Sequence, residues 1–471
     1  MSNPSVGSII GSETTPLRVA IIGSGPAGFY TVSNLLKQRD MHISMDMFER
    51  LPTPFGLVRA GVAPDHQKYK SVTNVYNKSA QHDNFRFFGN VSYGEHLNLD
   101  DLKRHYHQIV FTTGAQSDRS LGIPGEDLAG SHSATDFVAW YNGHPDYVDC
   151  QFDLSQENVV IVGLGNVAVD VARILCKTDS ELKHTDIADY ALDALKLSKV
   201  KNVYILGRRG PAQAAFTPPE IKEMGELEDA DISVSYDEAH IDETSRAALE
   251  ESGDKASKKN VAIIEGYGEW HVHEKSKQLT IRFLVSPTEL VGNAEGQVCS
   301  IKLVKNETYM DKNGGIKARS NGEEEVLSTG LVFRSVGYRG VPLPEIPFNE
   351  TDGVIYNCEG RITDADAKVQ KGLYVAGWIK RGPTGVIGTN KTDAQETVAR
   401  MVEDVKSGNI LNPDSPSKAA LFDFVFSKQP DAVTYDDWTQ IDQKEIENGI
   451  EADRPRVKFT VLSDMLNVLE R

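Results

Sequence analysis

Two short glycine-rich segments contain residue types suited to binding a phosphate group. The first is Gly23-Ser24-Gly25-Pro26-Ala27-Gly28, and the second is Gly163-Leu164-Gly165-Asn166-Val167-Ala168. Glycines at this spacing let the backbone turn tightly and bring its N–H groups close to a pyrophosphate. One such segment is weak evidence, because glycine triplets are common in turns. Two of them favour a protein that binds two dinucleotides.

Charged side chains follow each segment at the place where the adenosine ribose of a dinucleotide would lie. Glu49 comes about 20 residues after the first glycines, where an acid can accept hydrogen bonds from ribose hydroxyls. Arg208 and Arg209 follow the second segment, and paired guanidinium donors suit a 2′-phosphate. We therefore expect FAD at the first site and NADP(H) at the second. The alternatives are a solvated acid at a strand end and two surface arginines.

Each glycine segment joins an apolar strand to a helix, which is the β-α-β pattern of a dinucleotide-binding unit. A right-handed crossover is expected in both copies. The predicted elements are strands over 18–22, 43–48, 158–162 and 202–206, a helix over 27–39, and an extra helix between 177 and 201.

The rest of the chain is more varied. Residues 226–259 are charged and predict a surface helix or a mobile loop, and polar residues 311–325 predict a hairpin loop. Further strands are predicted over 279–285, 298–304, 330–337 and 372–377, the first two within a run of short alternating strands that starts at Trp270.

A rigid turn rich in glycine and proline, 378–388, follows the strand at 372–377 and leads into a helix from Asn390. Such a turn can bring backbone N–H groups close to a planar ring, so we expect it to complete the FAD pocket. The tail beyond Asn412, with Trp438 and an amphipathic stretch over 461–469, is expected to pack against the first domain without chemistry of its own.

These patterns predict an α/β fold of two Rossmann-like, three-layer dinucleotide-binding domains. The FAD-binding domain is predicted to be discontinuous, comprising 18–114 and 337–471, with the NADP-binding domain, 115–336, inserted between the two parts. Residues 1–17 are predicted to form a flexible arm.

The composition limits the class of protein. The 471 residues carry a formal net charge of −18, which argues against a broad surface for nucleic acid or anionic lipid. No apolar run reaches the roughly 18 residues that a membrane-spanning helix needs. The first 16 residues contain no lysine or arginine, so neither a secretory signal nor a mitochondrial presequence is expected. We predict a bacterial cytoplasmic protein, with a matrix protein lacking its presequence as the alternative.

The four cysteines (Cys150, Cys176, Cys299 and Cys358) are far apart in the sequence and include no CxxC pair. This spacing argues against a local redox disulfide, a zinc site and a cysteine-ligated cluster, so no metal site is predicted. The sequence lacks the close cysteine pair that a disulfide-reducing flavoprotein needs. It also lacks the cysteine clusters that an amino-donating flavoprotein carries near its amino terminus. No catalytic triad or pair of carboxylates stands out either.

One longer segment is far more specific than the glycines. The string Pro54-Phe55-Gly56-Leu57-Val58-Arg59-Ala60-Gly61-Val62-Ala63-Pro64-Asp65-His66 resembles the adrenodoxin reductase family, the NADPH–ferredoxin reductases of glutathione-reductase-like fold. Residues 207–216 with Thr217 and Glu220, and residues 378–387, are similar to the same family. The resemblance covers the chain from about residue 18 to residue 400.

The resemblance implies an FAD-dependent ferredoxin–NADP⁺ oxidoreductase with a defined set of contacts. Together with the glycine segments it assigns to FAD the residues Gly23, Gly25, Ala27, Gly28, Glu49, Leu57, Val91, Trp378, Gly385, Val386 and Ile387. It assigns to NADP(H) the residues Gly163, Leu164, Gly165, Asn166, Arg208, Arg209, Glu220 and Gly385.

Two further residues, His66 and Asp170, are similar to family residues near the flavin ring and are tentative catalytic groups. Their simpler interpretations are a loop histidine and a helix carboxylate. Pro218 and Pro219 stand where the family usually begins a helix without proline. Proline is tolerated in a first helical turn, so Glu220 is expected to keep its place.

The resemblance also implies a partner, a ferredoxin or adrenodoxin-like iron–sulfur protein that supplies a cytochrome P450 or an iron–sulfur assembly system. Both proteins would be acidic, so docking requires a local basic patch. The candidates are Lys255, Lys258, Lys259, Lys380 and Arg381, with Arg246 possible. A solvated loop is the alternative for the lysines. A monomer is expected, and a non-catalytic NADP-binding scaffold is the alternative function, which would lack the visible absorbance of flavin.

Overall fold

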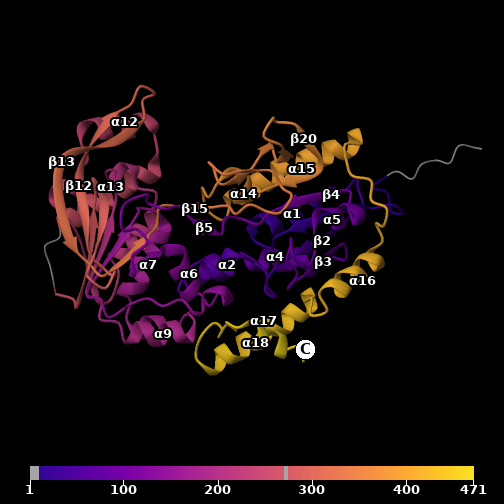
Figure 1. The fold of residues 1–471 in the computed structure, drawn as a ribbon, viewed down its shortest axis with the longest axis horizontal. Coiled ribbons are helices and arrows are strands. Elements are labelled where there is room, and N and C mark those ends of the chain that lie inside the picture. The colour runs from indigo at the N-terminus through magenta and orange to yellow at the C-terminus, as the bar shows by residue number, and fades with distance from the viewer. Residues whose placement is uncertain (1–9, 270–273, 471) are drawn as a thin grey trace, which may run out of the picture.

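The computed structural model describes residues 10–269 and 274–470. Two sheets form the centres of two units that lie side by side (Figure 1). Strands from 17–111 and 357–375 make the first sheet, and strands from 131–334 make the second. These are the parts of the chain that the sequence assigned to two separate dinucleotide-binding domains; the domain bounds themselves stay a prediction.

The first sheet has seven strands, and its central strands are parallel. Every residue of its central strand is buried, as expected for a parallel strand covered on both faces. In spatial order the strands are β18 (Asn357–Cys358), β19 (Arg361–Thr363), β20 (Val369–Val375), β4 (Gln108–Phe111), β1 (Leu17–Ile22), β2 (Ile43–Phe48) and β3 (Phe85–Phe88).

Helices and a small hairpin surround this sheet. The helices are α1 (Pro26–Leu35), α2 (Leu57–Ala60), α3 (Gln67–Lys70), α4 (Thr73–Ala80), α5 (Leu99–His105), α14 (Trp378–Arg381) and α15 (Thr389–Ser407). The hairpin pairs β16 (Phe348–Asn349) with β17 (Val354–Ile355). α1 packs closely against α15, so the early and late parts of the chain share one core, and the predicted discontinuity is seen directly.

The second sheet has six parallel strands. In spatial order they are β6 (Ser131–Ser133), β14 (Leu331–Arg334), β7 (Asn158–Val162), β8 (Asn202–Leu206), β10 (Lys277–Arg282) and β9 (Ala230–Val234). The helices of this unit are α6 (Ala134–Tyr141), α7 (Asn166–Cys176), α8 (Asp179–Leu182), α9 (Asp189–Lys196), α10 (Pro218–Met224), α11 (Tyr236–Ala239), α12 (Glu243–Ser252) and α13 (Lys255–Gly268), with 3-10 turns η1 (Pro145–Tyr147) and η2 (Pro211–Gln213).

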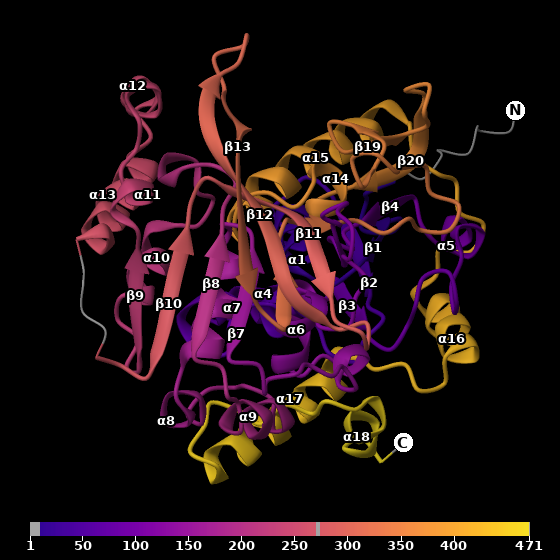
Figure 2. The same ribbon diagram turned by 60° about the vertical axis from the view of Figure 1, so that its left-hand side comes forward.

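An antiparallel sheet covers one face of the second sheet, opposite α7. It contains β11 (Val285–Gly292), β12 (Val298–Met310) and β13 (Ile316–Ser328). Leu290 and Ile301 of this layer pack on Val160 and Val162 of β7. The three-layer prediction therefore holds, with a β layer on one side. The hairpin of β12 and β13 projects beyond the sheet (Figure 2).

Two local predictions were incomplete and one was wrong. The charged stretch 226–259 contains helices, as one of its two interpretations predicted, but it also contains β9, an edge strand whose alternating residues are buried. In 311–325 only the turn is a loop, because β13 starts at Ile316 and pairs with β12. Residues 10–16 are held on the fold: the N–H of Gly11 donates to the Thr15 carbonyl, and the His42 N–H donates to the Gly11 carbonyl, each at 2.8 Å. The predicted arm over 1–9, and the start of the predicted strands at 270–273, lie outside the described residues.

The two units are joined by a short antiparallel pair, β5 (Ser117–Asp118) with β15 (Tyr338–Arg339), and by the tail. The tail contains α16 (Lys418–Lys428), α17 (Tyr435–Glu451) and α18 (Leu462–Asn467). Trp438 is buried in the core of the first unit, as predicted. Beyond α17, however, the tail also contacts the second unit, which the sequence did not predict. Among the described residues, no helix is long and apolar enough to cross a membrane.

Candidate functional site

One cavity of about 1820 Å³ is lined by residues of both units. Both glycine turns lie in its wall, with Glu49 from β2's end and the arginine pair from β8's end. Each of the residues assigned to a cofactor from the sequence lines this cavity except Gly28, and His66 and Asp170 line it too. Residues almost 370 positions apart, from Gly23 to Ile387, therefore share one site.

The turn between β1 and α1 depends on two glycines with structural roles. Gly23 has φ +104°, and a Cβ there would lie 2.8 Å from the carbonyl oxygen of Thr112. Gly28 does not line the cavity; a Cβ there would lie 2.3 Å from the Gly23 carbonyl oxygen, so its absence lets α1 pack on the turn. Gly25 differs from both, because a Cβ there would meet no protein atom within 4 Å.

The first turn of α1 is open to a ligand. No side chain caps this helix at Gly25, whereas α5 and α17 are capped by Asn98 and Thr434. The first N–H groups of a helix have no partner within the helix, and they attract a phosphate at the positive end of the helix dipole. The glycine turn therefore fits a pyrophosphate.

Glu49 lies beside this turn and holds it. Its Oε2 accepts hydrogen bonds from the backbone N–H of Ser24 at 3.0 Å and from the Ser24 hydroxyl at 2.7 Å. Its Oε1 accepts from the Leu51 N–H at 3.1 Å. The carboxylate keeps lone pairs for further donors, so it can stabilise the turn and accept from a hydroxyl group in the cavity.

The second glycine turn repeats the geometry of the first. Gly163 has φ +137°, and a Cβ there would lie 2.1 Å from the Ser335 carbonyl oxygen. At Gly165 a Cβ would meet nothing within 4 Å, and no side chain caps α7. Asn166 is occupied in holding the next loop, since its Oδ1 accepts from the Thr217 N–H at 2.9 Å.

Arg208 and Arg209 line the cavity beyond this turn. Among the described residues, no carboxylate forms an ion pair with either guanidinium. Partial burial, followed by the charge of Arg208, lowers the pKa of Arg209. Two neighbouring cations without a counter-charge make this end of the cavity suited to an anion.

Glu220 is held inside the cavity wall by α10. Both prolines fit the first turn of this helix, as predicted, and the Glu220 side chain is buried. Its Oε2 has no hydrogen-bond partner, and burial is the main cause of its raised pKa. A buried, unpartnered carboxyl oxygen in a cavity wall is suited to a donor group on a ligand.

His66 and Asp170 lie close together in the same wall. His66 Nε2 is 2.9 Å from Oε2 of Glu223, and its Nδ1 is 3.8 Å from Oδ1 of Asp170. Burial raises the pKa of Asp170 to about 6, although Arg173, 3.0 Å away, and His66 act against that rise. The site therefore contains a carboxyl group able to hold a proton near neutral pH, with a histidine beside it.

The third glycine-rich segment closes the cavity. Trp378 begins α14, and its indole Nε1 donates to the Thr384 carbonyl at 3.2 Å, which fixes the ring against the turn. Gly385, Val386 and Ile387 follow in the cavity wall. The indole is therefore placed to contact a planar ring.

Sequence reasoning missed two groups in this site. Tyr338 lines the cavity, with its ring centroid 5.4 Å from that of Trp378. The signal was available, because Tyr338 follows Gly337 at the end of a buried strand, as the glycine turns do. Arg173 is buried and pairs with Asp65 and Asp170; an arginine three residues after Asp170 in an apolar helix was the available clue.

Two of the basic docking candidates are not exposed. Lys380 is buried and pairs with Asp393 at 3.2 Å and with Glu396. Arg381 donates to Asn390 Oδ1 at 3.1 Å and to Thr384. Both side chains stabilise the turn after α14, so they were wrongly chosen for a docking patch. The remaining lysines of that set are exposed on the first turns of α13.

The four cysteines are free, and none lines the cavity. The site thus offers phosphate donors, a ribose acceptor, an anion-binding arginine pair and an aromatic plane, without a thiol. Such a set fits two dinucleotides bound end to end in one cavity, and it does not fit thiol–disulfide exchange.

Comparison with known proteins agrees with this geometry. Residues 17–236 match the family model described as pyridine nucleotide-disulphide oxidoreductase. The NADPH-ferredoxin reductase FprA of Mycobacterium tuberculosis is 43% identical over 463 residues, which cover 96% of this chain and 99% of that protein. The chain belongs to this oxidoreductase family. The resemblance to the adrenodoxin reductases is confirmed as well.

Two other matches extend the comparison. The mitochondrial NADPH:adrenodoxin oxidoreductase of Arabidopsis thaliana is 40% identical, with 97% of this chain and 96% of that protein covered. The solved structure of M. tuberculosis FprA in complex with NADPH superimposes with a TM-score of 0.91 at 43% identity, and covers 96% of this chain and 99% of that one. The predicted α/β fold is therefore confirmed over almost the whole chain.

Proposed function

We propose that this chain is an NADPH–ferredoxin reductase of the adrenodoxin reductase type, with FAD in the first unit and NADP(H) in the second. The observation that carries the proposal is the single cavity that both glycine turns line, with Glu49 at one end and an unpaired arginine pair at the other. FAD in such a site accepts a hydride and releases electrons singly, which links a two-electron donor to a one-electron carrier.

In the first unit, backbone donors of the turn at Gly25 and Ala27 would hold the pyrophosphate of FAD, and Glu49 would accept from its adenosine ribose. Gly23 shapes this turn, because its own N–H donates to the Phe48 carbonyl at 2.8 Å. Gly28 supports this turn through packing. The walls around the flavin ring are assigned to Leu57, Val91, Trp378, Gly385, Val386 and Ile387.

In the second unit, Gly163, Leu164, Gly165 and Asn166 receive the pyrophosphate of NADP(H). Arg208 and Arg209 bind the 2′-phosphate, because they are two adjacent cations in this wall that have no carboxylate partner among the described residues. Glu220 and the backbone at Gly385 hold the nicotinamide end. With both cofactors bound, these contacts would direct the nicotinamide end of NADP(H) toward the unit that holds FAD.

His66 and Asp170 hold and move a proton beside the flavin ring. The contact of His66 with Glu223 orients the imidazole, and the pKa of Asp170, raised to about 6 mainly by burial, keeps part of its population protonated near neutral pH. If His66→Gln left the turnover of NADPH with ferricyanide unchanged, His66 would have no part in the mechanism.

The partner is an acidic ferredoxin that docks on Lys255, Lys258 and Lys259 of α13, with Arg246 beside them on α12. These side chains are exposed, although Arg246 already pairs with Glu265 at 3.1 Å. α13 packs against η2, next to the arginine pair, so this surface belongs to the second unit. A local basic patch is needed because the whole chain carries a charge of −18.

The terminal acceptor is a cytochrome P450 or an iron–sulfur assembly system, the protein works as a monomer, and its compartment is the bacterial cytoplasm or, as the alternative, the mitochondrial matrix. Relatives carry both bacterial and mitochondrial names. We also propose the predicted bounds for the domains, with 115–336 as the NADP-binding part, since the strands of the second sheet lie within 131–334 and those of the first sheet lie outside 115–336.

The purified protein tests the function in two steps. It should absorb near 450 nm as a flavoprotein does; a colourless protein that binds NADPH would favour the scaffold alternative. Protein reduced anaerobically by NADPH should then transfer electrons to a [2Fe–2S] ferredoxin. The loss of the ferredoxin's visible absorbance measures this transfer. Reduced protein that does not reduce any iron–sulfur protein offered would contradict the reductase function.

A further inference from the structure

The carboxyl-terminal tail bridges the two units. Trp438 of α17 packs on Phe55 of the first unit, with ring centroids 5.9 Å apart. After α17 the chain runs beside α9 of the second unit (Figures 1 and 2). There Arg454 Nε donates to the Thr185 carbonyl at 2.8 Å, and its guanidinium pairs with Asp189. The tail therefore touches both units through specific contacts.

On the flavin side, the tail is fixed by Glu445 of α17. Its side chain is fully buried, and its Oε2 accepts a hydrogen bond from Nη1 of Arg59 at 2.8 Å. The N–H of Phe459 donates to Glu445 Oε1 at 2.9 Å, which draws the chain after α17 back to the same carboxylate. Arg59 also lies over the Trp438 ring at 5.3 Å.

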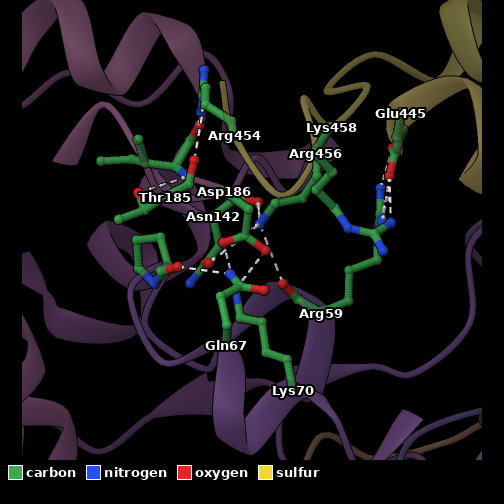
Figure 3. Close-up of polar contacts among 12 residues, drawn as sticks. Arg59, Gln67, Lys70, Asn142, Thr185, Asp186, Glu445, Arg454, Arg456 and Lys458 are labelled. Carbon is green, nitrogen blue, oxygen red and sulfur yellow. Dashed lines mark hydrogen bonds and ion pairs between the residues drawn. The ribbon is translucent and has the colours of Figure 1, made fainter. Parts of the chain in front are cut away.

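Between the units, one carboxylate lies among two lysines from different parts of the chain (Figure 3). Asp186, which precedes α9, accepts from Lys70 Nζ of α3 at 2.6 Å and 2.8 Å. Lys458 of the tail approaches the same carboxylate at 3.7 Å and donates to the Asn142 carbonyl at 2.9 Å. The side chains of Asp186 and Lys458 are 3% and 1% exposed.

These charges depend on one another. Burial alone raises the pKa of Asp186, but Lys458 and Lys70 outweigh it and hold that pKa at about 2. Burial also lowers the pKa of Lys458 well below its usual value, against the attraction of Asp186. A buried ion pair adds little net stability, yet it strongly disfavours arrangements in which a charge loses its partner. The cluster therefore favours one relative placement of the three segments.

The segments that these charges connect lie next to the residues of the cofactor site. Arg59 follows Leu57 by two positions in α2, and Lys70 ends the short helix that begins after His66. Asp186 belongs to the unit that holds the arginine pair. Transfer between two bound rings depends steeply on their separation and orientation, and a displacement of about 1 Å can cost a factor of about 100 in rate.

We propose that Asp186, Lys70 and Lys458 are positioning residues, which hold the NADP-binding unit against the flavin-binding unit at the separation that hydride transfer needs. The inference rests on the proposed function. The three side chains act through the placement of the units and do not line the cavity.

The test compares the holoproteins Lys458→Met and Asp186→Asn with wild type and with Lys444→Met. Lys444 of α17 is the matched control, because its side chain is half exposed and its Nζ forms only a long ion pair, 3.8 Å from Oε2 of Glu447 in the same helix. Three quantities are measured: flavin content, the affinity for 2′,5′-ADP, and the rate of flavin bleaching at saturating NADPH. The long-wavelength absorbance that arises from overlap of nicotinamide and flavin gives a fourth.

We expect the bleaching rate to fall about 10-fold or more in both Lys458→Met and Asp186→Asn, with weaker long-wavelength absorbance. The affinity for 2′,5′-ADP should stay within twofold, because that probe binds the second unit alone. A bleaching rate within twofold of wild type, or a parallel loss of 2′,5′-ADP affinity, would overturn the proposal. If Lys458→Met does not fold, Asp186→Asn alone tests the proposal, because it keeps the shape of the side chain. Failure of wild type itself to be reduced by NADPH would instead reject the proposed function.

Discussion

At the scale of single residues, charge pairing separates the two dinucleotide sites. Glu49 is already hydrogen-bonded to the turn that it serves, whereas Arg208 and Arg209 have no carboxylate partner among the described residues. Two adjacent cations without a counter-charge attract an anion. This asymmetry supports our proposal that the second site binds the 2′-phosphate.

Replacing Arg209 by alanine should raise the dissociation constant for NADPH roughly 10- to 100-fold, since a hydrogen bond to a charged group contributes about 1.5–3 kcal/mol. The dissociation constant for NADH should stay within about twofold, because NADH has no 2′-phosphate. Titration of flavin absorbance measures both. Arg246→Ala, an exposed arginine of neighbouring α12 that pairs with Glu265, is the control and should change neither.

Asp170 makes stability depend on pH. Its folded pKa of about 6 lies above the ordinary value of 3.8, so the folded protein holds this proton more tightly than the unfolded chain. That contribution is full below about pH 4 and lost as the pH rises through about 6. Two pKa units correspond to about 3 kcal/mol.

Asp170→Asn should therefore remove this contribution, so that the free energy of unfolding declines less between pH 4 and pH 7, as measured by urea unfolding with excess FAD. Asp193→Asn, an exposed aspartate of α9, should keep the wild-type slope. An unchanged slope in Asp170→Asn would show that its carboxyl group titrates normally.

At the scale of elements, each glycine turn combines one glycine that the backbone needs with one that the ligand needs. Gly163 has a positive φ and sits against Ser335, whereas Gly165 faces open space. Gly165→Ala should leave the melting temperature unchanged and weaken NADPH binding about 10-fold or more, because the methyl group occupies the place of the phosphate. Gly163→Ala should instead lower the melting temperature. A calorimetric scan and an NADPH titration of both variants check this; equal effects of the two would contradict it.

The elements were predicted best where a local signal was strong. The strands at Ile43–Phe48 and Asn202–Leu206 have the predicted bounds, because apolar runs and glycine turns delimit them. β9 was missed because its alternating pattern lies within a charged stretch, and β13 because exposed edge residues such as Glu323 and Glu324 give no apolar alternation. β9 forms because it pairs with β10, and β13 forms because it pairs with β12.

The site followed the same rule. The placement of the glycine turns, Glu49 and the arginine pair in one cavity could be predicted, since their spacing along the chain is fixed by the β-α-β unit. The burial of Lys380 could not, because its carboxylate partner Asp393 comes from the following helix, α15. Nor could the contacts of Tyr338 and Lys458, which depend on how the two units meet.

At the scale of the whole molecule, a strongly acidic protein must still attract an acidic carrier. Lys258→Glu should raise the KM for ferredoxin roughly two- to fivefold at low ionic strength, because an exposed charge pair contributes up to about 1 kcal/mol. The difference should shrink as salt is added. Lys78→Glu, an exposed lysine of α4 in the other unit, should have a smaller effect. A KM insensitive to both salt and Lys258→Glu would exclude this docking surface.

We propose that one cavity brings NADPH and FAD together, with the phosphate-selective end in the second unit. Oxidised protein is mixed anaerobically with NADPH or with NADH in a stopped-flow instrument, and flavin absorbance is followed near 450 nm. We predict rapid bleaching by NADPH, and bleaching by NADH that reaches a comparable rate only at a much higher concentration. Equal reduction by NADH at equal low concentration, or no reduction by NADPH, would contradict the account.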